Sequence, residues 1–435
     1  MRCGFLGRMT PSLDYPLYAR TLANGLRVQV NPDHAAPIVA VNLWYDVGSR
    51  DEEPGHTGFA HLFEHVMFQG SAHVASGEHL TLMQNAGGSV NATTWFDRTN
   101  YFETIPVGAL DLALWLEADR LSSLADALTT ENFENQRDVV KEEKRQRYDN
   151  QPYGDAIERI IALAFPQGHP YAHTTIGSMA DLDASTVEDA LAFFKRHYVP
   201  GVAVLTLVGD IEPDEAFAKA ERYFGTIPAV ARPLRPEAPP LPPIAGVPRE
   251  VVTAKVPQDA VYAIWRLPAR GTREFDSVDL ALTVLGGGQT SRIYRALVRD
   301  GGLAETAGAA AMPLIGGTSF GYAFARALNG VDAARLEAAF VAAIELFLVD
   351  GPTEQEVARA KVQYEREWLG ELASFDSRAD LFGAFQTLLG DATLVNTRIA
   401  DFAEITPSEV LAAAQKYLQP DQRAVLTYLK EADHG

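Results

Sequence analysis

Five consecutive residues, His61-Leu62-Phe63-Glu64-His65, carry side chains that could bind a metal ion and activate water on it. On a helix, positions 61 and 65 share one face and position 64 lies beside them. One ion could then bind both imidazoles while the carboxylate reaches a water molecule on that ion. This order of residues is typical of a group of zinc hydrolases. The motif therefore predicts a metal site with His61 and His65 as ligands and Glu64 as general base.

A catalytic zinc ion takes three protein ligands and keeps one position open, so a third ligand must come from elsewhere in the chain. The best candidate region is 130–149, which has the pattern of a charged helix with few apolar residues. It carries Glu142 and Glu143 side by side, and either one could face the metal. Alternatively, both belong to a solvated face and pair with neighbouring Lys and Arg side chains. The residue types alone leave these alternatives open.

Further motifs follow the histidine pair in a fixed order along the first half of the chain. They are Met67-Phe68-Gln69-Gly70, then Gly87-Gly88-Ser89-Val90-Asn91-Ala92, then Asp97-Arg98-Thr99-Asn100-Tyr101, and finally Arg137-Asp138-Val139-Val140 ahead of the two glutamates. This series resembles the family that includes pitrilysin, insulin-degrading enzyme and the mitochondrial processing peptidases. The resemblance implies a zinc endopeptidase that holds one Zn²⁺ per chain.

The resemblance also selects a third ligand. In the family, the glutamate that ends an R-x-V-V-x-x-E pattern binds zinc, and this pattern ends at Glu143 here. A shift of one residue would make Glu142 the ligand instead. The family has an acidic residue seven positions earlier, in a supporting place near the ligands, and this chain departs from that pattern with Gln136.

Residues 89–95 and 99–105 have the β-branched and aromatic composition of two neighbouring strands. A strand edge beside the metal could accept an extended peptide as an added strand. The family's Asn-Ala pair at this edge corresponds to Asn91 and Ala92, so the resemblance implies that these two residues bind the substrate. The alternative is an ordinary hairpin without a binding role.

The chain has the organisation of a duplication. Residues 228–248 contain eight prolines in 21 positions and predict a stiff, extended linker. Residues 185–208 and 406–429 resemble each other, each with a helix, a proline turn and an Ala-Val-Leu-Thr strand. We therefore predict a metal-bearing catalytic domain at 1–227 and a homologous domain without metal at 249–435.

We expect an α+β fold in which each domain is an antiparallel sheet covered by helices, the two together forming a clam-like half chamber. Strands are predicted near 25–31, 38–47, 89–105, 202–209, 250–256, 260–267, 318–327 and 423–429, with helices at 107–126, 130–150, 331–348 and 352–372. Aligning the last of these helices with 130–150 puts Arg366 where Glu143 stands, so the second domain has no matching metal site.

Composition excludes several other classes of function. The net charge of −20 argues against a nucleic-acid partner and against docking on an anionic membrane. We find neither an apolar run long enough to span a membrane nor a secretory signal, so we expect a cytoplasmic protein, or a periplasmic one if a signal segment has been removed. The only cysteine is Cys3, so a thiol nucleophile is not expected and a disulfide within the chain is impossible.

The second half departs from active members of the family at two positions. Those members carry an Arg and, seven residues later, a Tyr that hold the substrate across from the zinc, and this chain has Val298 and Glu305 there. Valine cannot donate a hydrogen bond and a carboxylate would repel a developing oxyanion. We therefore expect peptide substrates to be cleaved by a heterodimer with a homologous subunit that carries the Arg and Tyr.

Two alternatives remain at this point. Arg292, Tyr294 or Arg295 could take over the task in a monomer or homodimer. The chain could also be a non-catalytic structural or peptide-binding subunit of the same fold.

Overall fold

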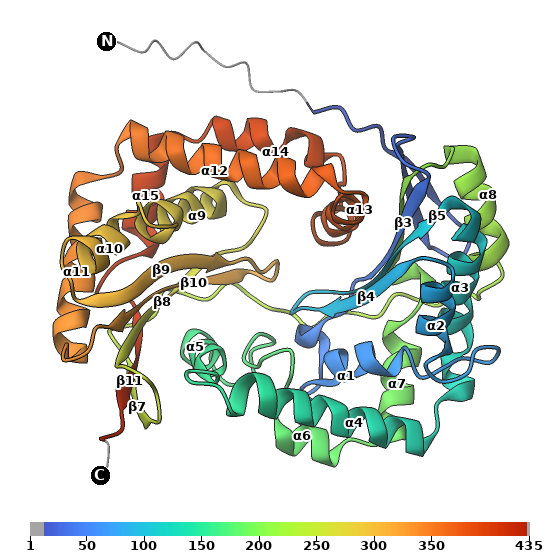
Figure 1. Cartoon of the computed structure of the whole chain (residues 1–435), viewed down its shortest axis with the longest axis horizontal. Coiled ribbons are helices and arrows are strands. Elements are labelled where there is room, and N and C mark those ends of the chain that lie inside the picture. Colours follow the sequence, from blue (N-terminus) through green and yellow to red (C-terminus); the bar gives the residue numbers. More distant parts are fainter. Residues whose placement is uncertain (1–12, 433–435) are drawn as a thin grey trace.

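The computed structural model describes residues 13–432, and Cys3 lies outside this range. It contains two sheets, one in each half of the chain, with helices around both (Figure 1). None of the helices in the described range is long and apolar enough to cross a membrane.

The first sheet has the strand order β1-β2-β6-β3-β5-β4, which leaves β4 at an edge. Its strands are β1 (Tyr18–Thr21), β2 (Arg27–Pro32), β3 (Ile38–Tyr45), β4 (Ser89–Thr94), β5 (Thr99–Pro106) and β6 (Ala203–Gly209). The helices of this half are α1 (Phe59–Val66), α2 (Glu78–Asn85), α3 (Leu110–Ala127), α4 (Thr130–Lys144), α5 (Ala156–Ala164), α6 (Met179–Ala184), α7 (Val187–His197) and α8 (Pro213–Phe224). A turn of π-helix at Arg145–Asp149 extends α4.

The second sheet has the order β7-β11-β8-β10-β9, with β9 at an edge. Its strands are β7 (Arg249–Ala254), β8 (Ala260–Pro268), β9 (Ala304–Met312), β10 (Thr318–Ala327) and β11 (Ala424–Lys430). The helices of this half are α9 (Arg273–Gly286), α10 (Arg292–Tyr294), α11 (Ala333–Asp350), α12 (Glu354–Ala373), α13 (Phe375–Ala384), α14 (Leu394–Ala403) and α15 (Pro407–Tyr417), with π-helical turns at Arg295–Arg299 and Phe385–Leu389.

The two halves share one topology, which confirms the predicted α+β fold of two related domains. In each half the last strand returns to lie between two earlier strands, so β6 separates β2 from β3 as β11 separates β7 from β8. The returning strand runs parallel to β2 or β7 and antiparallel to its other neighbour. The sheets are therefore mixed rather than wholly antiparallel, because a strand inserted after a long helical excursion can enter in either direction. The predicted domain limits stay predictions.

Two strands were not predicted. The four residues of β1 are all exposed and pair only with β2. In β9, five of nine residues are alanine, a composition that disfavours strands in isolation. Helix α9 explains this composition, because a Cβ on Gly286 would lie 2.1 Å from the backbone nitrogen of Ala309. Close packing of helix on strand requires small residues on both sides, and pairing with β10 supplies the strand's stability.

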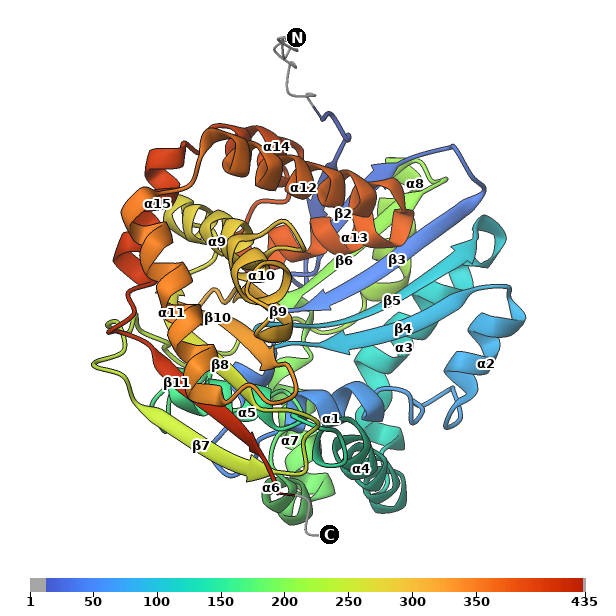
Figure 2. The ribbon, with the colours of Figure 1, turned by 60° about the vertical axis from the view of Figure 1, so that its left-hand side comes forward.

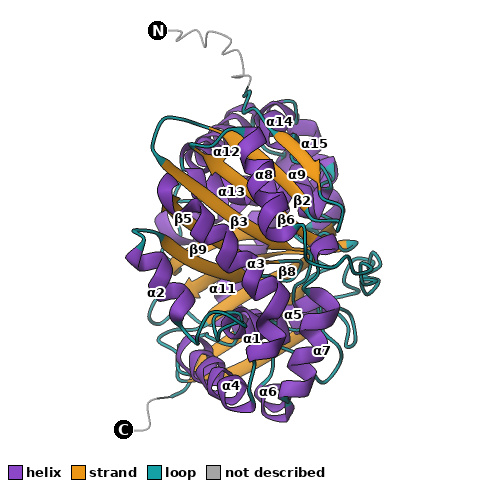
Figure 3. Ribbon diagram, turned by 90° about the vertical axis from the view of Figure 1, so that its right-hand side faces the viewer, coloured by secondary structure: helices purple, strands orange, loops and turns teal. Residues whose placement is uncertain are grey.

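One helix from each half packs against the sheet of the other half. Successive residues of β3 point to opposite faces. One face carries Val39, Val41 and Leu43, which belong to the core beneath α3 and α8. Figure 3 shows these two helices on the outside of the sheet. The other face carries Ala40 and Trp44, which belong to a cluster with α13 of the second half. In return, Ile160, Ile161 and other residues of α5 pack with β8, β10 and β11. Figures 1 and 2 both show α13 against the first sheet and α5 against the second.

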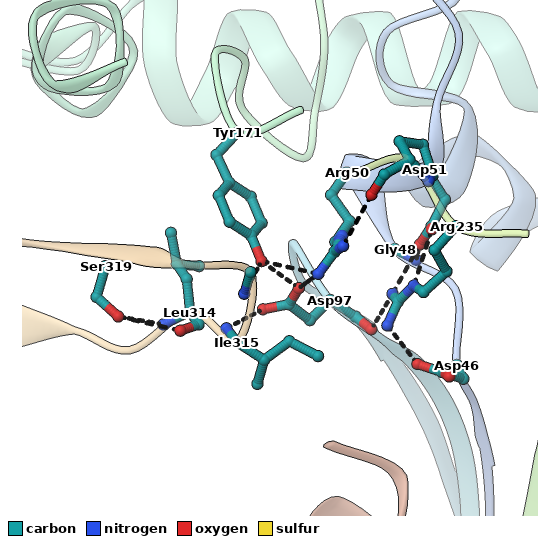
Figure 4. A network of polar contacts seen from close by, with 12 residues as sticks. Asp46, Gly48, Arg50, Asp51, Asp97, Tyr171, Arg235, Leu314, Ile315 and Ser319 are labelled. Carbon is teal, nitrogen blue, oxygen red and sulfur yellow. Dashed lines mark hydrogen bonds and ion pairs between the residues drawn. The ribbon is translucent and has the colours of Figure 1, made fainter. Parts of the chain in front are cut away.

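The segment between α8 and β7 is anchored by ion pairs. Its Arg232 and Arg235 bind the buried carboxylate of Asp46. Arg235, labelled in Figure 4, also binds Asp51, with 2.8 Å between Nη2 and Oδ2. Arg50 donates to the backbone oxygen of Pro236 at 3.1 Å. The start of the proline-rich segment is therefore fixed to the first half, whereas its later part contacts the second half, where the backbone nitrogen of Leu241 donates to the hydroxyl of Thr318 at 2.7 Å.

Helix α13 approaches the first sheet closely at Gly383. An added Cβ there would lie 2.6 Å from Cδ1 of Trp44. We expect Gly383→Ala to lower the free energy of unfolding by about 1–3 kcal/mol, because the indole and helix must move apart. The matched control is Gly370→Ala in α12, where a Cβ meets nothing within 4 Å, and which should stabilise the helix by roughly 0.5–1 kcal/mol. Urea unfolding midpoints measure both changes, and equal effects at the two glycines would contradict the close packing.

Candidate active site

Helix α1 holds the histidine motif, and its apolar face determines how the motif is presented. Phe59, Leu62, Phe63 and Val66 are buried in the first core. These positions follow helical spacing, so the remaining residues His61, Glu64 and His65 share the opposite, partly exposed face.

The start of α1 is anchored by a buried carboxylate. Gly58 precedes the helix with φ of 93°, a left-handed conformation that favours glycine. Glu52 accepts hydrogen bonds at 2.8 Å from the backbone nitrogens of both Gly58 and Ala60. Its carboxylate also lies 2.9 Å from Nε2 of His173. Burial raises the pKa of Glu52, and the contact with His173 opposes this rise.

The structure brings Glu143 of α4 to the two histidines of α1. Its Oε2 lies 3.3 Å from Nε2 of His65 and 3.8 Å from Nε2 of His61. Ligand atoms around a tetrahedral zinc ion at 2.0–2.1 Å stand about 3.3 Å apart. The three side chains are only 13–24% exposed. Donor types and spacing therefore fit a divalent ion.

The protonation states of these groups also fit a metal ion. Burial lowers the pKa of His61 to about 4, with His65 adding to the effect, so this imidazole is neutral near pH 7. The hydrogen bond with His65 lowers the pKa of Glu143, which is therefore ionised. Arg147 binds the other oxygen of Glu143 at 2.7 Å, which leaves Oε2 free to face the histidines. Neutral imidazoles and an ionised carboxylate are the forms that bind metals.

Glu64 is held by the adjacent edge strand. The hydroxyl of Thr94, the last residue of β4, donates to Oε2 of Glu64 at 2.5 Å. Burial raises the pKa of Glu64, and the Thr94 hydrogen bond opposes this rise. A buried carboxylate with a raised pKa and one free oxygen is suited to exchange protons with a reacting group.

Two other predicted positions on α4 lie apart from the cluster. Glu142 is 54% exposed and its carboxylate contacts Arg145 and Gln146 at 3.3 and 3.0 Å. Gln136 lies two helical turns before Glu143 and is partly buried. In the described part of the chain we find no side-chain hydrogen bond of Gln136 to the site residues.

A cavity of about 340 Å³ lies next to Glu64 and His65. Its walls are Phe68 after α1, Leu80 and Gln84 of α2, and Val90, Asn91 and Ala92 of β4. Asn91 is exposed and Ala92 is buried, as expected for successive residues of a strand, whose side chains point to opposite faces. The structure therefore brings the predicted substrate residues to the same place as the histidines and the base.

A second cluster was not predicted from the sequence. His79, Glu103 and Glu117 are buried with ligand atoms within 4.8 Å of one another. Arg120 binds Glu117 through Nε and NH2, so a guanidinium already supplies the positive charge among these groups. Burial raises the pKa of both carboxylic acids, and Arg120 opposes the rise. Within residues 13–432 these two clusters are the only groups of this kind, and both lie in the first half.

The positions that differ from the family's Arg and Tyr are committed to other contacts. Val298 packs against the second core. Glu305 is the second residue of β9, and its Oε1 lies 3.7 Å from Nε of Arg326. Arg292 binds Glu356 at 2.8 Å and the backbone oxygen of Gly351 at 2.7 Å, so it is held within the second half.

Three residues that support the site were not predicted from the sequence: Thr94, Glu52 and His173. Glu52 lies six residues before Gly58, so an acidic residue shortly before a helix was a usable signal. No local pattern identifies Thr94 or His173, because their contacts depend on how distant segments pack.

The fold and site define a two-domain protein with a His-His-Glu cluster beside an exposed sheet edge, and comparisons with known proteins agree. Zinc protease PqqE of Helicobacter pylori is 29% identical over 417 residues, covering 94% of this chain and 92% of that protein. The mitochondrial-processing peptidase subunit beta of Lentinula edodes is 28% identical over 219 residues, covering 49% of this chain and 45% of that protein.

Solved structures show the same architecture. The crystal structure of a protease from Helicobacter pylori superposes with a TM-score of 0.89 at 28% identity, covering 95% of this chain and 99% of that one. A peptidase M16 inactive domain from Pseudomonas fluorescens has a TM-score of 0.83 at 19% identity, covering 96% and 98%, and shows the fold alone.

Family profiles cover both halves of the chain. Residues 27–178 match "Insulinase (Peptidase family M16)" and residues 184–364 match "Peptidase M16 inactive domain". The chain belongs to the M16 peptidase family, the pitrilysin-type family that its motifs resemble.

Proposed function

We propose that this protein is a zinc-dependent endopeptidase that cleaves peptides or unfolded segments. The observation that carries the proposal is the convergence of His61, His65 and Glu143 beside a carboxylate, Glu64, at the edge of a sheet. The name of the Helicobacter pylori relative, zinc protease PqqE, supports both the metal and the activity.

The chemistry follows from these residues. A zinc ion held by His61, His65 and Glu143 would polarise the scissile carbonyl and lower the pKa of a nearby water molecule. Glu64 then takes a proton from the attacking water on Oε1, because Oε2 is occupied by the Thr94 hydroxyl. As the carbon–nitrogen bond breaks, Glu64 passes that proton to the leaving amine. No covalent intermediate with the protein is needed.

The edge strand β4 supports binding of an extended peptide. It pairs only with β5, so its other side can accept a peptide as an added strand. The backbone nitrogen of Ala92 donates to Oδ1 of Asn91 at 2.9 Å, and a bound peptide would replace that bond. Main-chain hydrogen bonds to the backbone around Asn91 and Ala92 would then give affinity with little dependence on sequence. The adjoining cavity, with Phe68, Leu80 and Val90 in its walls, favours one apolar side chain next to the cleaved bond.

The third ligand can be tested by metal content. Glu143→Gln should lower zinc affinity at least tenfold. Removing a residue that only supports a ligand already costs about tenfold, and removing the ligand itself should cost more. Glu142→Gln should keep close to one ion per chain, because this side chain faces solvent. Zinc bound after dialysis is measured for both variants. The reverse result would move the ligand to Glu142.

The base can be tested by turnover. Glu64→Gln should keep zinc and fold but lower kcat by about 100-fold or more, since an amide cannot accept the water's proton. Cleavage of a quenched peptide is measured with and without a chelator, and Glu134→Gln on the exposed face of α4 is the control. Retention of more than roughly a tenth of wild-type kcat would refute the base. Zinc binding without turnover in any assembly would favour a peptide-binding subunit.

We further propose that a homologous second subunit completes the site. Val298 and Glu305 cannot stabilise a developing oxyanion, and Arg292 is held by Glu356. The partner would lack the His-x-x-Glu-His motif and carry the Arg and Tyr of active family members. The related mitochondrial-processing peptidase chain of Lentinula edodes is itself named as a subunit.

The partner proposal predicts that the purified chain binds zinc but cleaves peptides weakly. Adding the homologous chain should raise kcat/KM by at least about 100-fold, because loss of one oxyanion donor costs about that much. Peptide cleavage is titrated against the partner, with size-exclusion chromatography to follow assembly. Full activity from the single chain would refute the two-subunit arrangement.

A further inference from the structure

The turn between β4 and β5 is held by the second half of the chain on two sides. On one side, Asp97 accepts a hydrogen bond from the backbone nitrogen of Ile315 at 3.2 Å and from the hydroxyl of Tyr171 at 2.6 Å (Figure 4). On the other side, Asp380 of α13 reaches the base of the same hairpin. The hairpin therefore lies between two segments that follow it by more than 200 residues.

Asp380 makes three hydrogen bonds to the first sheet through a single oxygen. Its Oδ1 accepts from Nδ2 of Asn100 at 2.9 Å, from Nε1 of Trp44 at 3.0 Å and from Nδ2 of Asn42 at 3.3 Å. Burial raises the pKa of this carboxyl, and the positive charge of Arg98 opposes the rise. Removing this acceptor would leave Nε1 of Trp44 and Nδ2 of Asn42 without it, whereas Nδ2 of Asn100 would keep its bond to Oδ1 of Asn42 at 3.2 Å.

Arg98 and Asn100 transmit this contact across the hairpin. The NH1 group of Arg98 donates at 2.9 Å both to Oδ1 of Asn100 and to the backbone oxygen of Thr93. The Thr93 hydroxyl also donates to Oδ1 of Asn100 at 2.5 Å. The guanidinium lies over the Trp44 ring, 5.0 Å from its centroid. The last residues of β4 are thus tied to the strand that Asp380 holds.

The next residue along β4 is Thr94, which holds Glu64. Because β4 is an edge strand, only β5 pairs with it in the sheet, and the backbone nitrogen of Ser49 donates to the backbone oxygen of Trp95, just after the end of β4, at 3.2 Å. Hydrogen bonds therefore run from Asp380 through Asn100 and Arg98 to Thr93, and the next residue in the chain, Thr94, orients the base.

We propose that Asp380, in the half of the chain without the histidine motif, is a positioning residue for Glu64 and acts through the β4–β5 hairpin. This inference rests on the proposed peptidase function. It assigns to the second half an indirect, positioning role in the reaction of this chain, separate from any contribution of a partner subunit. Asp380 itself contacts neither the metal ligands nor the base.

The kinetic test compares two substitutions at Asp380. Asp380→Ala removes the shared acceptor and should lower kcat by about 10- to 100-fold, since small misplacements of a reacting group have effects of that size. KM should stay within about threefold, because the proposed peptide contacts are main-chain groups further along β4. Asp380→Asn keeps Oδ1 and should retain most of kcat. Asp376→Ala, on the exposed start of the same helix, should leave kcat unchanged.

A double-mutant cycle tests the route. Thr94→Val removes only the hydroxyl that holds Glu64 and should lower kcat by a similar factor. The double variant with Asp380→Ala should lose no more than the worse single variant, because both changes break one pathway. Three results would overturn the proposal. The first is a loss of kcat in the double variant equal to the product of the two single losses. The others are full kcat in either single variant, and an equal loss of kcat in Asp380→Asn and Asp380→Ala. If Asp380→Ala does not fold, the full kcat of Thr94→Val would still overturn it.

Amide hydrogen exchange provides a readout that needs no activity. Asp380→Ala should speed exchange of the amides at 94–100 by about tenfold or more while leaving α15 unchanged, because local opening replaces a fixed hairpin. Unchanged exchange in the hairpin would refute the physical link. If the wild-type chain with zinc cleaved no peptide in any assembly, the proposed function would fail, whereas the exchange result would still report whether the hairpin depends on Asp380.

Discussion

The first sheet must be covered on both faces, and its own half of the chain covers only one. The alternation along β3 makes this need explicit: Val41 and Leu43 face the first core, while Ala40 and Trp44 face α13. Exposed, that second face would be a large apolar patch beside the candidate active site. The second half covers it with α13, and the first half covers part of the second sheet with α5. The position of the site's elements depends on this exchange. Helix α5 follows the helix that bears Glu143, and α13 contacts β3, β5 and β6, next to the β4–β5 hairpin whose Thr94 holds Glu64.

The exchange gives different roles to two equivalent pairs of helices. Helices α4 and α5 in the first half correspond in order to α12 and α13 in the second. On α4, Glu143 faces two histidines, whereas Arg366, its predicted counterpart on α12, is 74% exposed and lies beside Glu367. The duplicated fold has therefore kept the packing of these helices, while the metal-type residues occur in one copy. Loss of ligands in the second half did not remove its contact with the reacting region, since α13 still reaches the first sheet.

Much of this could be predicted from the sequence where the information is local. The His-x-x-Glu-His spacing is set by one helix, and strands such as β10 carry enough β-branched and aromatic residues to be found without a structure. Other features depend on contacts between distant segments. The alanines of β9 are explained by the close packing of α9 on that strand. The choice between Glu142 and Glu143 needed a family pattern, because adjacent residues on a helix point in different directions and only packing shows which one faces the histidines. Thr94 and Asp380 belong to this second kind, since neither type of residue has a distinctive spacing from Glu64.

The covering of the first sheet also constrains how the chain can be made. During synthesis, all strands of the first sheet are made long before α13 exists to cover Trp44. During that interval the nascent first half has an open apolar face, which is a condition that promotes aggregation. Completion of the fold is therefore late in synthesis, and the two halves behave as one unit of biogenesis although each contains a complete sheet.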